Sequence, residues 1–259
     1  MKVLITGAAG LIGTLLRERL SARFEICAVD LKRQPGVRRV DTRSIETVSK
    51  YVAGMDAVVD LAAVANADAP WEAVSANNLR AVATVLEAAH LNAVPRVIFA
   101  SSNHVTGLYE EDEPYRSVVA GRYDGLDPAQ IPLIGPDWPM RPDGPYGMSK
   151  ALGEAMCRTY SASYGISTIS LRIGTVNPAD RPTGPREFAT LLSHDDLCEL
   201  VACALTAPAS VQHGIYYGVS RNTWRIWDTA NATSELGFVA RDDAESFRAT
   251  HGASSVSDG

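Results

Sequence analysis

A tyrosine and a lysine stand four residues apart in the segment Tyr146-Gly147-Met148-Ser149-Lys150, which we predict to be helical. Residues at this spacing lie on one face of a helix, one turn apart. A free phenol has a pKa of about 10 and is a poor base at neutral pH, but a neighbouring ammonium group stabilises the phenolate and lowers that pKa. The pair therefore predicts proton transfer at the tyrosine hydroxyl, with a solvated or packing pair as the alternative.

A third candidate, Ser102, lies just beyond the apolar run Val97–Ala100. Open parallel sheets bind their ligands at the carboxyl ends of the strands. A hydroxyl at such an end can hydrogen-bond the reacting oxygen, so Ser102 completes the predicted catalytic set. The alternative is an ordinary strand end that is rich in serine.

A glycine-rich turn follows the first apolar run, Lys2–Thr6, and precedes a helical segment. Glycine permits a tight turn and a close approach of the backbone to a pyrophosphate, whose charge is met by the helix N-terminus. A plain strand–helix junction is the alternative that a glycine-rich turn alone leaves open. The predicted contacts to a dinucleotide in this turn are Gly7, Gly10, Leu11, Ile12 and Gly13.

Two aspartates extend the predicted nucleotide site. Asp30 ends the second apolar run, where a carboxylate can accept hydrogen bonds from both adenosine ribose hydroxyls and would repel a 2′-phosphate. This favours NAD over NADP, although Lys32 and Arg33 lie close enough along the chain to weaken the preference. Asp41, at the end of the third apolar run, is predicted to bind the adenine amino group or, alternatively, to cap a turn.

Short apolar runs alternate with amphipathic segments of helical length, which indicates βαβ units on a parallel sheet. The predicted strands are Lys2–Thr6, Glu25–Asp30, Val37–Asp41, Ala57–Leu61, Val97–Ala100, Thr168–Arg172 and Gly214–Tyr217. The predicted helices are Leu11–Ser21, Ile45–Ala53, Trp71–Leu91, Gly147–Tyr164 and His194–Thr206. The predicted fold class is α/β, a Rossmann-type doubly wound parallel sheet with helices on both faces and a small C-terminal substrate-binding portion. We expect residues 1–259 to form a single NAD-binding domain.

Two segments stand outside this alternation. Residues 109–145 are rich in proline and too long for a plain connection, so we expect an insert over the active site that acts as a lid or a binding loop. The residues from about 247 onward are mostly small and polar, and we expect them to be disordered.

The composition argues against several classes of protein. A net charge of −6 and a pI near 5.4 disfavour a nucleic-acid-binding surface. Apolar runs fall short of the roughly 18 residues that suggest a membrane span, and a strand begins so early that no signal peptide is expected. The four cysteines lack metal-ligand spacing, so we expect no metal and a cytoplasmic protein with reduced core thiols at Cys27, Cys157, Cys198 and Cys203.

These residues together resemble the extended short-chain dehydrogenases, the NAD-dependent epimerase/dehydratase superfamily. The resemblance is carried by Thr6-Gly7-x-x-Gly10-x-x-Gly13, Asp30, Ser102 and Tyr146-x-x-x-Lys150. It implies that Asn78 organises the active site and that the cofactor site includes Leu61, Ala62 and Ala63. It also suggests a homodimer that packs through the two long predicted helices.

Finer motifs resemble the uronate dehydrogenases of this superfamily. They are Ser101-Ser102-Asn103-His104, Leu171-Arg172-Ile173-Gly174-Thr175, and Arg186 followed by Thr190-Leu191-Leu192-Ser193. The resemblance implies that Asn103 and His104 bind sugar hydroxyls, that Arg186 pairs with the sugar carboxylate, and that Thr175 lines the same pocket. A structural histidine and a surface arginine are the alternatives for His104 and Arg186.

The chain departs from the uronate dehydrogenases in two places. They have a serine where this chain reads Leu61-Ala62-Ala63-Val64-Ala65-Asn66. The insert at 109–145 is longer than theirs and is similar to one in the NAD-dependent glucose-6-phosphate dehydrogenases of halophilic archaea. The short region after the sixth strand leaves little room for a nucleotide sugar. We therefore predict oxidation of the anomeric C1 of a small acidic aldose, a uronate or a sugar phosphate, to a lactone.

Two other functions stay open at this point. A sugar epimerase or dehydratase, or another small-substrate reductase, fits the same motifs; an epimerase or dehydratase regenerates NAD in each cycle, whereas a dehydrogenase accumulates NADH. A non-catalytic regulatory protein would bind the dinucleotide without turnover, although such proteins commonly lack the tyrosine–lysine pair.

Overall fold

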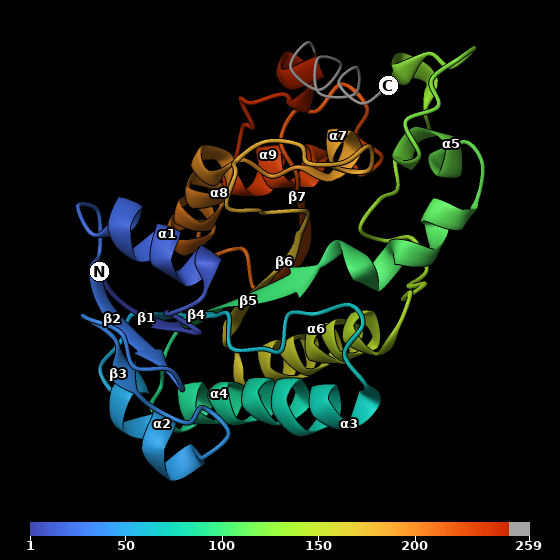
Figure 1. The fold of residues 1–259 in the computed structure, drawn as a ribbon. Coiled ribbons are helices and arrows are strands. Elements are labelled where there is room, and N and C mark those ends of the chain that lie inside the picture. The colour runs from blue at the N-terminus through green and yellow to red at the C-terminus, as the bar shows by residue number, and fades with distance from the viewer. Residues whose placement is uncertain (249–259) are drawn as a thin grey trace.

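The computed structural model describes residues 1–248, and a seven-stranded sheet forms their centre (Figure 1). The strands are β1 (Lys2–Thr6), β2 (Glu25–Asp30), β3 (Arg38–Arg39), β4 (Ala57–Asp60), β5 (Arg96–Ser102), β6 (Ser167–Ile173) and β7 (His213–Gly218). Their order across the sheet is β3-β2-β1-β4-β5-β6-β7, and every neighbouring pair is parallel. This confirms the predicted α/β doubly wound class. The strand order reverses between β1 and β4, which is where such sheets bind ligands.

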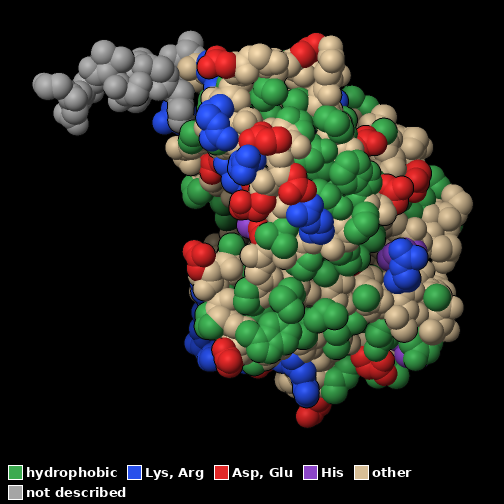
Figure 2. Space-filling model, turned by 90° about the vertical axis from the view of Figure 1, so that its right-hand side faces the viewer, with side chains coloured by type: hydrophobic (Ala, Val, Ile, Leu, Met, Phe, Trp, Pro, Cys, Tyr) green, Lys and Arg blue, Asp and Glu red, His purple; other side chains and the backbone are tan. Residues whose placement is uncertain are grey.

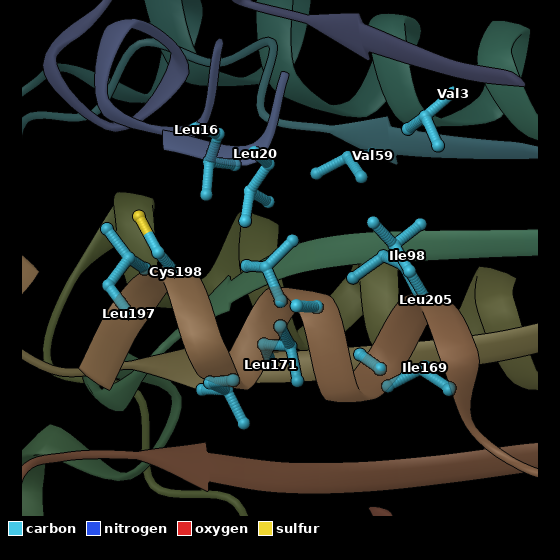
Figure 3. Packing of buried hydrophobic residues seen from close by; sticks show 14 of the residues in the cluster. Val3, Leu16, Leu20, Val59, Ile98, Ile169, Leu171, Leu197, Cys198 and Leu205 are labelled. Carbon is cyan, nitrogen blue, oxygen red and sulfur yellow. The ribbon is translucent and has the colours of Figure 1, made fainter. Parts of the chain in front are cut away.

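Helices cover both faces of the sheet, as Figure 1 shows. One face carries α1 (Leu11–Leu20), α8 (His194–Thr206) and α9 (Ala230–Leu236), and the other carries α2 (Ile45–Val52), α4 (Arg80–Leu91) and α6 (Pro145–Tyr164). Alternate residues of each strand face opposite sides. In β1, Val3 and Ile5 join the α1 and α8 core drawn in Figure 3, while Leu4 joins the α2, α4 and α6 core.

The long helix predicted at 71–91 is interrupted near its start. It consists of α3 (Trp71–Val74), one π-helical turn η1 (Ser75–Leu79) and α4. The third strand is also shorter than predicted: only Arg38 and Arg39 form the ladder, on the exposed edge of the sheet. The remaining predicted elements agree with the structure to within a few residues at each end.

The insert at 109–145 is folded rather than extended. It includes the end of η2 (Asn103–Glu111), then α5 (Tyr115–Val119) and η3 (Pro128–Gln130). Its buried Tyr109, Val118 and Ile134 belong to one hydrophobic cluster with Tyr217 and Trp227 of the core. Its two ends are joined by backbone hydrogen bonds, from Leu108 N to Arg141 O and from Arg141 N to Val105 O, both 3.0 Å long.

The C-terminal part adds α7 (Glu187–Thr190) and η4 (Ala244–Phe247). The first two residues of the predicted disordered tail are ordered: Phe247 ends η4, and Arg248 donates two hydrogen bonds to Glu245. Residues 249–259 lie outside the described part of the chain.

The surface and the thiols agree with the composition. On the face drawn in Figure 2, acidic and basic side chains are interspersed. All four cysteines are free; Cys157 and Cys198 are buried, and Cys27 and Cys203 are half-buried. Within residues 1–248, no helix combines the length and apolar character that crossing a bilayer requires.

A buried ion pair ties α6 to the centre of the sheet. The Arg172 guanidinium of β6 donates from Nε and Nη2 to the two carboxylate oxygens of Glu154 on α6, each at 2.9 Å, and both side chains are fully buried. Ser101 Oγ of β5 donates to the same carboxylate at 2.6 Å, and Arg172 Nη1 donates to the Tyr217 hydroxyl at 3.0 Å. One carboxylate thus fixes α6 against β5 and β6.

Replacing this carboxylate should destabilise the fold strongly, because it leaves a buried guanidinium without its counter-ion. We expect Glu154→Gln to lower the free energy of unfolding by about 3 to 5 kcal/mol, measured by urea denaturation. The matched control is Glu245→Gln at the half-exposed pair with Arg248, where a loss below about 1 kcal/mol is expected. Equal losses in the two variants would contradict this reading of the buried pair.

Candidate active site

A cleft of about 670 Å³ lies at the carboxyl ends of the central strands. It runs from the glycine turn after β1, past the loop after β4, to the ends of β5 and β6. Most of the predicted site residues line it: Gly7, Gly10, Leu11, Ile12, Gly13, Asp30, Leu61, Ala62, Ala63, Ser102, Asn103, His104, Tyr146, Lys150 and Thr175. The cleft lining does not include Asp41, Asn78 or Arg186.

The turn between β1 and α1 has no room for larger residues. Gly7 has φ of +62°, and a Cβ there would lie 2.8 Å from the Leu61 carbonyl carbon. A Cβ on Gly13 would lie 2.6 Å from the carbonyl oxygen of Gly7. Gly10 caps α1 without a side chain, and the first turn of that helix holds no acidic residue. The amide end of α1 therefore fits a pyrophosphate, as predicted.

Asp30 stands at one end of the cleft and is held by two backbone amides. Its Oδ2 accepts from Ala9 N at 3.0 Å and its Oδ1 from Lys32 N at 2.8 Å. Each carboxylate oxygen has a further lone pair, so the group can still accept from ribose hydroxyls. Lys32 lines the cleft beside it.

Asp41 is committed to a neighbouring cation. Arg43 donates to its Oδ1 from Nε at 2.9 Å and to its Oδ2 from Nη2 at 2.8 Å. These hydrogen bonds lower the pKa of Asp41 below its ordinary value. Arg43 itself lines the cleft and also donates to Asn77 Oδ1 at 2.8 Å. At this end of the cleft the guanidinium of Arg43 forms the lining, and Asp41 lies behind it.

The loop after β4 is fixed by a buried hydroxyl–carboxylate pair. Thr6 Oγ1 donates to Asp60 Oδ1 at 2.6 Å and accepts from the amides of Leu61 at 3.1 Å and Ala62 at 3.2 Å. Burial raises the pKa of Asp60, and the hydrogen bond from Thr6 and the charge of Lys150 oppose that rise. The pair joins the strand that precedes the glycine turn to the loop packed against that turn.

Tyr146 and Ser102 meet at the floor of the cleft. The tyrosine lies in the first turn of α6, and the serine ends β5. Burial raises the pKa of Tyr146, and a hydrogen bond with Ser102 opposes that rise. Ser102 Oγ also accepts from His104 N at 3.3 Å and lies 3.3 Å from Asn103 Oδ1. The two hydroxyls therefore lie side by side in the cleft lining.

Lys150 lies one helical turn beyond Tyr146 and is 4% exposed. Its Nζ is 5.0 Å from the centroid of the Phe99 ring and 5.6 Å from that of the Tyr146 ring. Burial lowers the pKa of Lys150 to about 8, and the negative charge of Asp60 limits the fall. In residues 1–248, no carboxylate forms an ion pair with this ammonium. Its charge therefore acts on Tyr146 and on whatever occupies the cleft.

Asn78 holds the site together from behind the cleft wall. Its Oδ1 accepts from Val64 N at 2.7 Å, and its Nδ2 donates to Ser149 Oγ at 3.1 Å. Ser149 Oγ in turn donates to Tyr146 O at 2.8 Å. The π-helical turn η1 contains Asn78, and such turns commonly occur at functional sites. Asn78 therefore positions the loop after β4 and the first turn of α6.

Asn103 and His104 form the wall next to Tyr146. Asn103 Nδ2 is buried and has no hydrogen-bond acceptor among the described residues, so it is a donor available to a ligand. The His104 ring packs edge-on against the Tyr146 ring, with 5.7 Å between centroids. His104 Nδ1 lies 2.6 Å from Asp143 Oδ2, which fixes the ring and leaves its Nε2 edge for the cleft.

Thr175 lines the far end of the cleft, and Arg186 stands behind it. Arg186 Nη1 donates to Thr175 Oγ1 at 3.4 Å. The rest of its guanidinium is paired with Glu110 of η2, at 2.6 Å from Nε and 2.7 Å from Nη2. Arg186, predicted to bind the sugar carboxylate, is thus next to the cleft, but its guanidinium already binds the carboxylate of Glu110 through two nitrogens.

Sequence reasoning missed Arg43, Asp60, Glu110 and Asp143. Asp60 carries a detectable signal, because it is a lone acid at the end of the otherwise apolar strand β4. Asp143 lies three residues before Tyr146, but its partner is 39 residues away in the chain. Nothing in the local sequence pairs Glu110 with Arg186. A search for clusters of metal-ligating side chains finds none in the described part of the chain.

Comparison with known proteins agrees with this geometry. A family model described as the NAD dependent epimerase/dehydratase family matches residues 3–195. Uronate dehydrogenase from Pseudomonas putida is 36% identical over 256 residues, covering 96% of this chain and 87% of that protein. NAD-dependent glucose-6-phosphate dehydrogenase from Haloferax volcanii is 29% identical, covering 95% of each chain. The crystal structure of a mutant uronate dehydrogenase from Agrobacterium tumefaciens complexed with NAD has a TM-score of 0.82 and 31% identity, covering 100% of this chain and 91% of that chain.

The charge of Asp60 should determine the pH at which Lys150 loses its proton. Lys150 is charged below its pKa of about 8 and neutral above it. Removing a nearby negative charge favours the neutral amine, so we expect Asp60→Asn to move this titration to a lower pH. The measurement is the lysine Cε shift by NMR with ¹³C-labelled lysine, assigned with Lys150→Arg. The control is Asp56→Asn, an exposed acid at the other end of β4. An unchanged midpoint in Asp60→Asn would refute the coupling.

Proposed function

Because the chain belongs to the NAD dependent epimerase/dehydratase family, we propose that it is an NAD-dependent dehydrogenase that oxidises C1 of a uronate to a lactone. The observation that carries this proposal is the meeting of Tyr146, Ser102 and the buried Lys150 at the floor of one cleft, opposite the glycine turn. A proton acceptor and a cofactor cradle then face the same space.

The residues around the cleft fit NAD. The amide end of α1 would hold the pyrophosphate, Asp30 the adenosine ribose, and Lys150 the nicotinamide ribose. The steric limits at Gly7 and Gly13 are those of a turn that brings its backbone against a ligand. When bound, NAD supplies the hydride acceptor for C1.

The protein's own contribution is to move one proton and to hold the sugar. Tyr146 Oη accepts the proton of the C1 hydroxyl, and Ser102 Oγ orients that hydroxyl. A hydrogen bond with Ser102 offsets part of the rise in the Tyr146 pKa that burial causes. The ammonium of Lys150, whose Nζ lies 5.6 Å from the centroid of the Tyr146 ring, further favours the phenolate. Asn103 Nδ2 and the Nε2 edge of His104 hydrogen-bond the sugar hydroxyls, while Thr175 and Arg186 receive the acidic group.

The substrate class follows from the relatives and from the space available. The Pseudomonas and Agrobacterium relatives are uronate dehydrogenases, and each covers nearly the whole of this chain. The Haloferax relative acts on a sugar phosphate, and a planar guanidinium also pairs with phosphate. An acidic aldose therefore fits better than a neutral one or a nucleotide sugar.

We also propose a cytoplasmic homodimer built as one domain per chain. The four free cysteines fit a reducing compartment. The helices on one side of the sheet expose large apolar side chains, which favour a protein contact. These side chains are Trp71 of α3, Leu91 of α4, and Met148, Leu152 and Tyr164 of α6.

The activity is tested by NADH absorbance with NAD and a panel of glucuronate, galacturonate, glucose 6-phosphate and neutral aldoses. Turnover of a uronate with net accumulation of NADH supports the proposal. NAD binding with no turnover of any sugar would favour an internal-redox epimerase or a binding protein.

Within this assay, Tyr146→Phe should abolish turnover and leave NAD binding intact, because it removes only the hydroxyl that takes the proton. We expect kcat to fall by at least about 10²-fold, the scale of a lost general base, with the NAD dissociation constant measured by calorimetry unchanged. Retention of most of the turnover would rule out Tyr146 as the proton acceptor.

A further inference from the structure

Arg186 lies next to the sugar end of the cleft, and the Nε–Nη2 edge of its guanidinium already binds Glu110. Glu110 accepts from Arg186 Nε at 2.6 Å and from Nη2 at 2.7 Å, the bidentate geometry in which a guanidinium binds a carboxylate. The pair is largely shielded from water, because the Glu110 side chain is 13% exposed and that of Arg186 34%. A substrate carboxylate that approaches this guanidinium therefore meets an internal carboxylate in the same place.

The backbone of Arg186 is held by contacts other than those with Glu110. The loop that carries it is held by the neighbouring Glu187, whose Oε2 accepts from Thr183 N at 2.6 Å and from Asn177 Nδ2 at 2.9 Å. The Arg186 backbone also caps α7. The pairing with Glu110 therefore acts on the guanidinium charge rather than on the placement of the chain.

The surroundings of Arg186 are acidic. Burial lowers the pKa of its guanidinium, whereas the carboxylates of Glu110, Asp143 and Glu187 raise it. The carboxylates outweigh burial, so the pKa of Arg186 lies above its ordinary value. One cation among three carboxylates leaves a local excess of negative charge. Arg186 Nη1 reaches the cleft wall by donating to Thr175 Oγ1 at 3.4 Å.

We propose that Glu110 is a specificity-determining residue: its carboxylate competes with the substrate carboxylate for Arg186 and so weakens the binding of uronates relative to neutral aldoses. This inference rests on the proposed function, in which Arg186 receives the acidic group. It assigns a role to the insert that begins beside the cleft, because η2 carries Glu110 into contact with the sugar end of the site.

The test compares glucuronate with glucose, which differs from it only in having a hydroxymethyl group at C6. Binding is measured by calorimetry on the complex with NADH, where no turnover occurs, and kcat/KM is measured with NAD. We expect Glu110→Gln to bind glucuronate about tenfold more tightly, as removal of one close like charge predicts. Affinity for glucose should change by less than about twofold. Glutamine keeps the shape of the side chain and one acceptor for Arg186.

Glu111→Gln is the matched control, since Glu111 is the exposed neighbour and the variant makes the same change in net charge. It should leave both sugars unaffected. A second comparison uses Arg186→Gln with and without Glu110→Gln. If Glu110 acts through Arg186, its substitution gives no gain in glucuronate affinity once the arginine is absent. Thermal unfolding of each variant verifies that it is folded.

Three outcomes would overturn the inference: unchanged glucuronate affinity in Glu110→Gln, weaker affinity, or an equal gain for glucose. Weaker affinity would make Glu110 a positioning residue for Arg186. Failure of the proposed function reads differently, because the wild-type protein with NAD bound would then turn over no sugar. The calorimetric comparison with NADH still decides the role of Glu110 in that case.

Discussion

The buried carboxylate of Glu154 is the contact on which the geometry of the site depends. Tyr146 and Lys150 lie on α6, whereas Ser102 lies at the end of β5, and the two elements belong to different layers of the molecule. Glu154 joins them, since it binds Ser101, the residue before Ser102, and Arg172 of the next strand. A buried ion pair is an expensive way to stabilise a fold, but it fixes one relative position of helix and sheet. This contact therefore also fixes Tyr146 and Lys150 relative to Ser102.

Buried polar contacts also fix the elements on the nucleotide side of the cleft. Thr6 and Asp60 join the strands on either side of the point where the strand order reverses. Asn78 joins the loop after β4 to the first turn of α6. Each link is short, buried and polar, and together they surround the cleft with groups that cannot turn away. In the proposed mechanism, this frame holds the phenol, the ammonium and the serine hydroxyl around one substrate oxygen atom.

The parts of the site that could be predicted from the sequence are those defined by residues close together in the chain. The glycine turn, Asp30 at a strand end, and the helical spacing of Tyr146 and Lys150 each need only a few consecutive residues to define them. The pairs Glu110–Arg186 and His104–Asp143 join segments 76 and 39 residues apart, so only the folded chain brings them together. The π-helical turn was also missed, because the hydrogen bonds of Asn78 that accompany it reach Val64 and Ser149 in other elements. Asp41 was predicted from its place in the chain, whereas its contact with Arg43 was not.

The insert has a consequence for how such an enzyme changes over evolutionary time. It leaves and rejoins the core at two adjacent points, where Leu108 and Val105 bond to Arg141. Glu110 and Asp143, near its two ends, bind Arg186 and His104, respectively. Under the proposed function, substitutions in this one segment would alter which sugar is accepted and would leave the nucleotide site unchanged. The proposal thus assigns the cofactor to one half of the cleft and substrate selection to the half beside the insert.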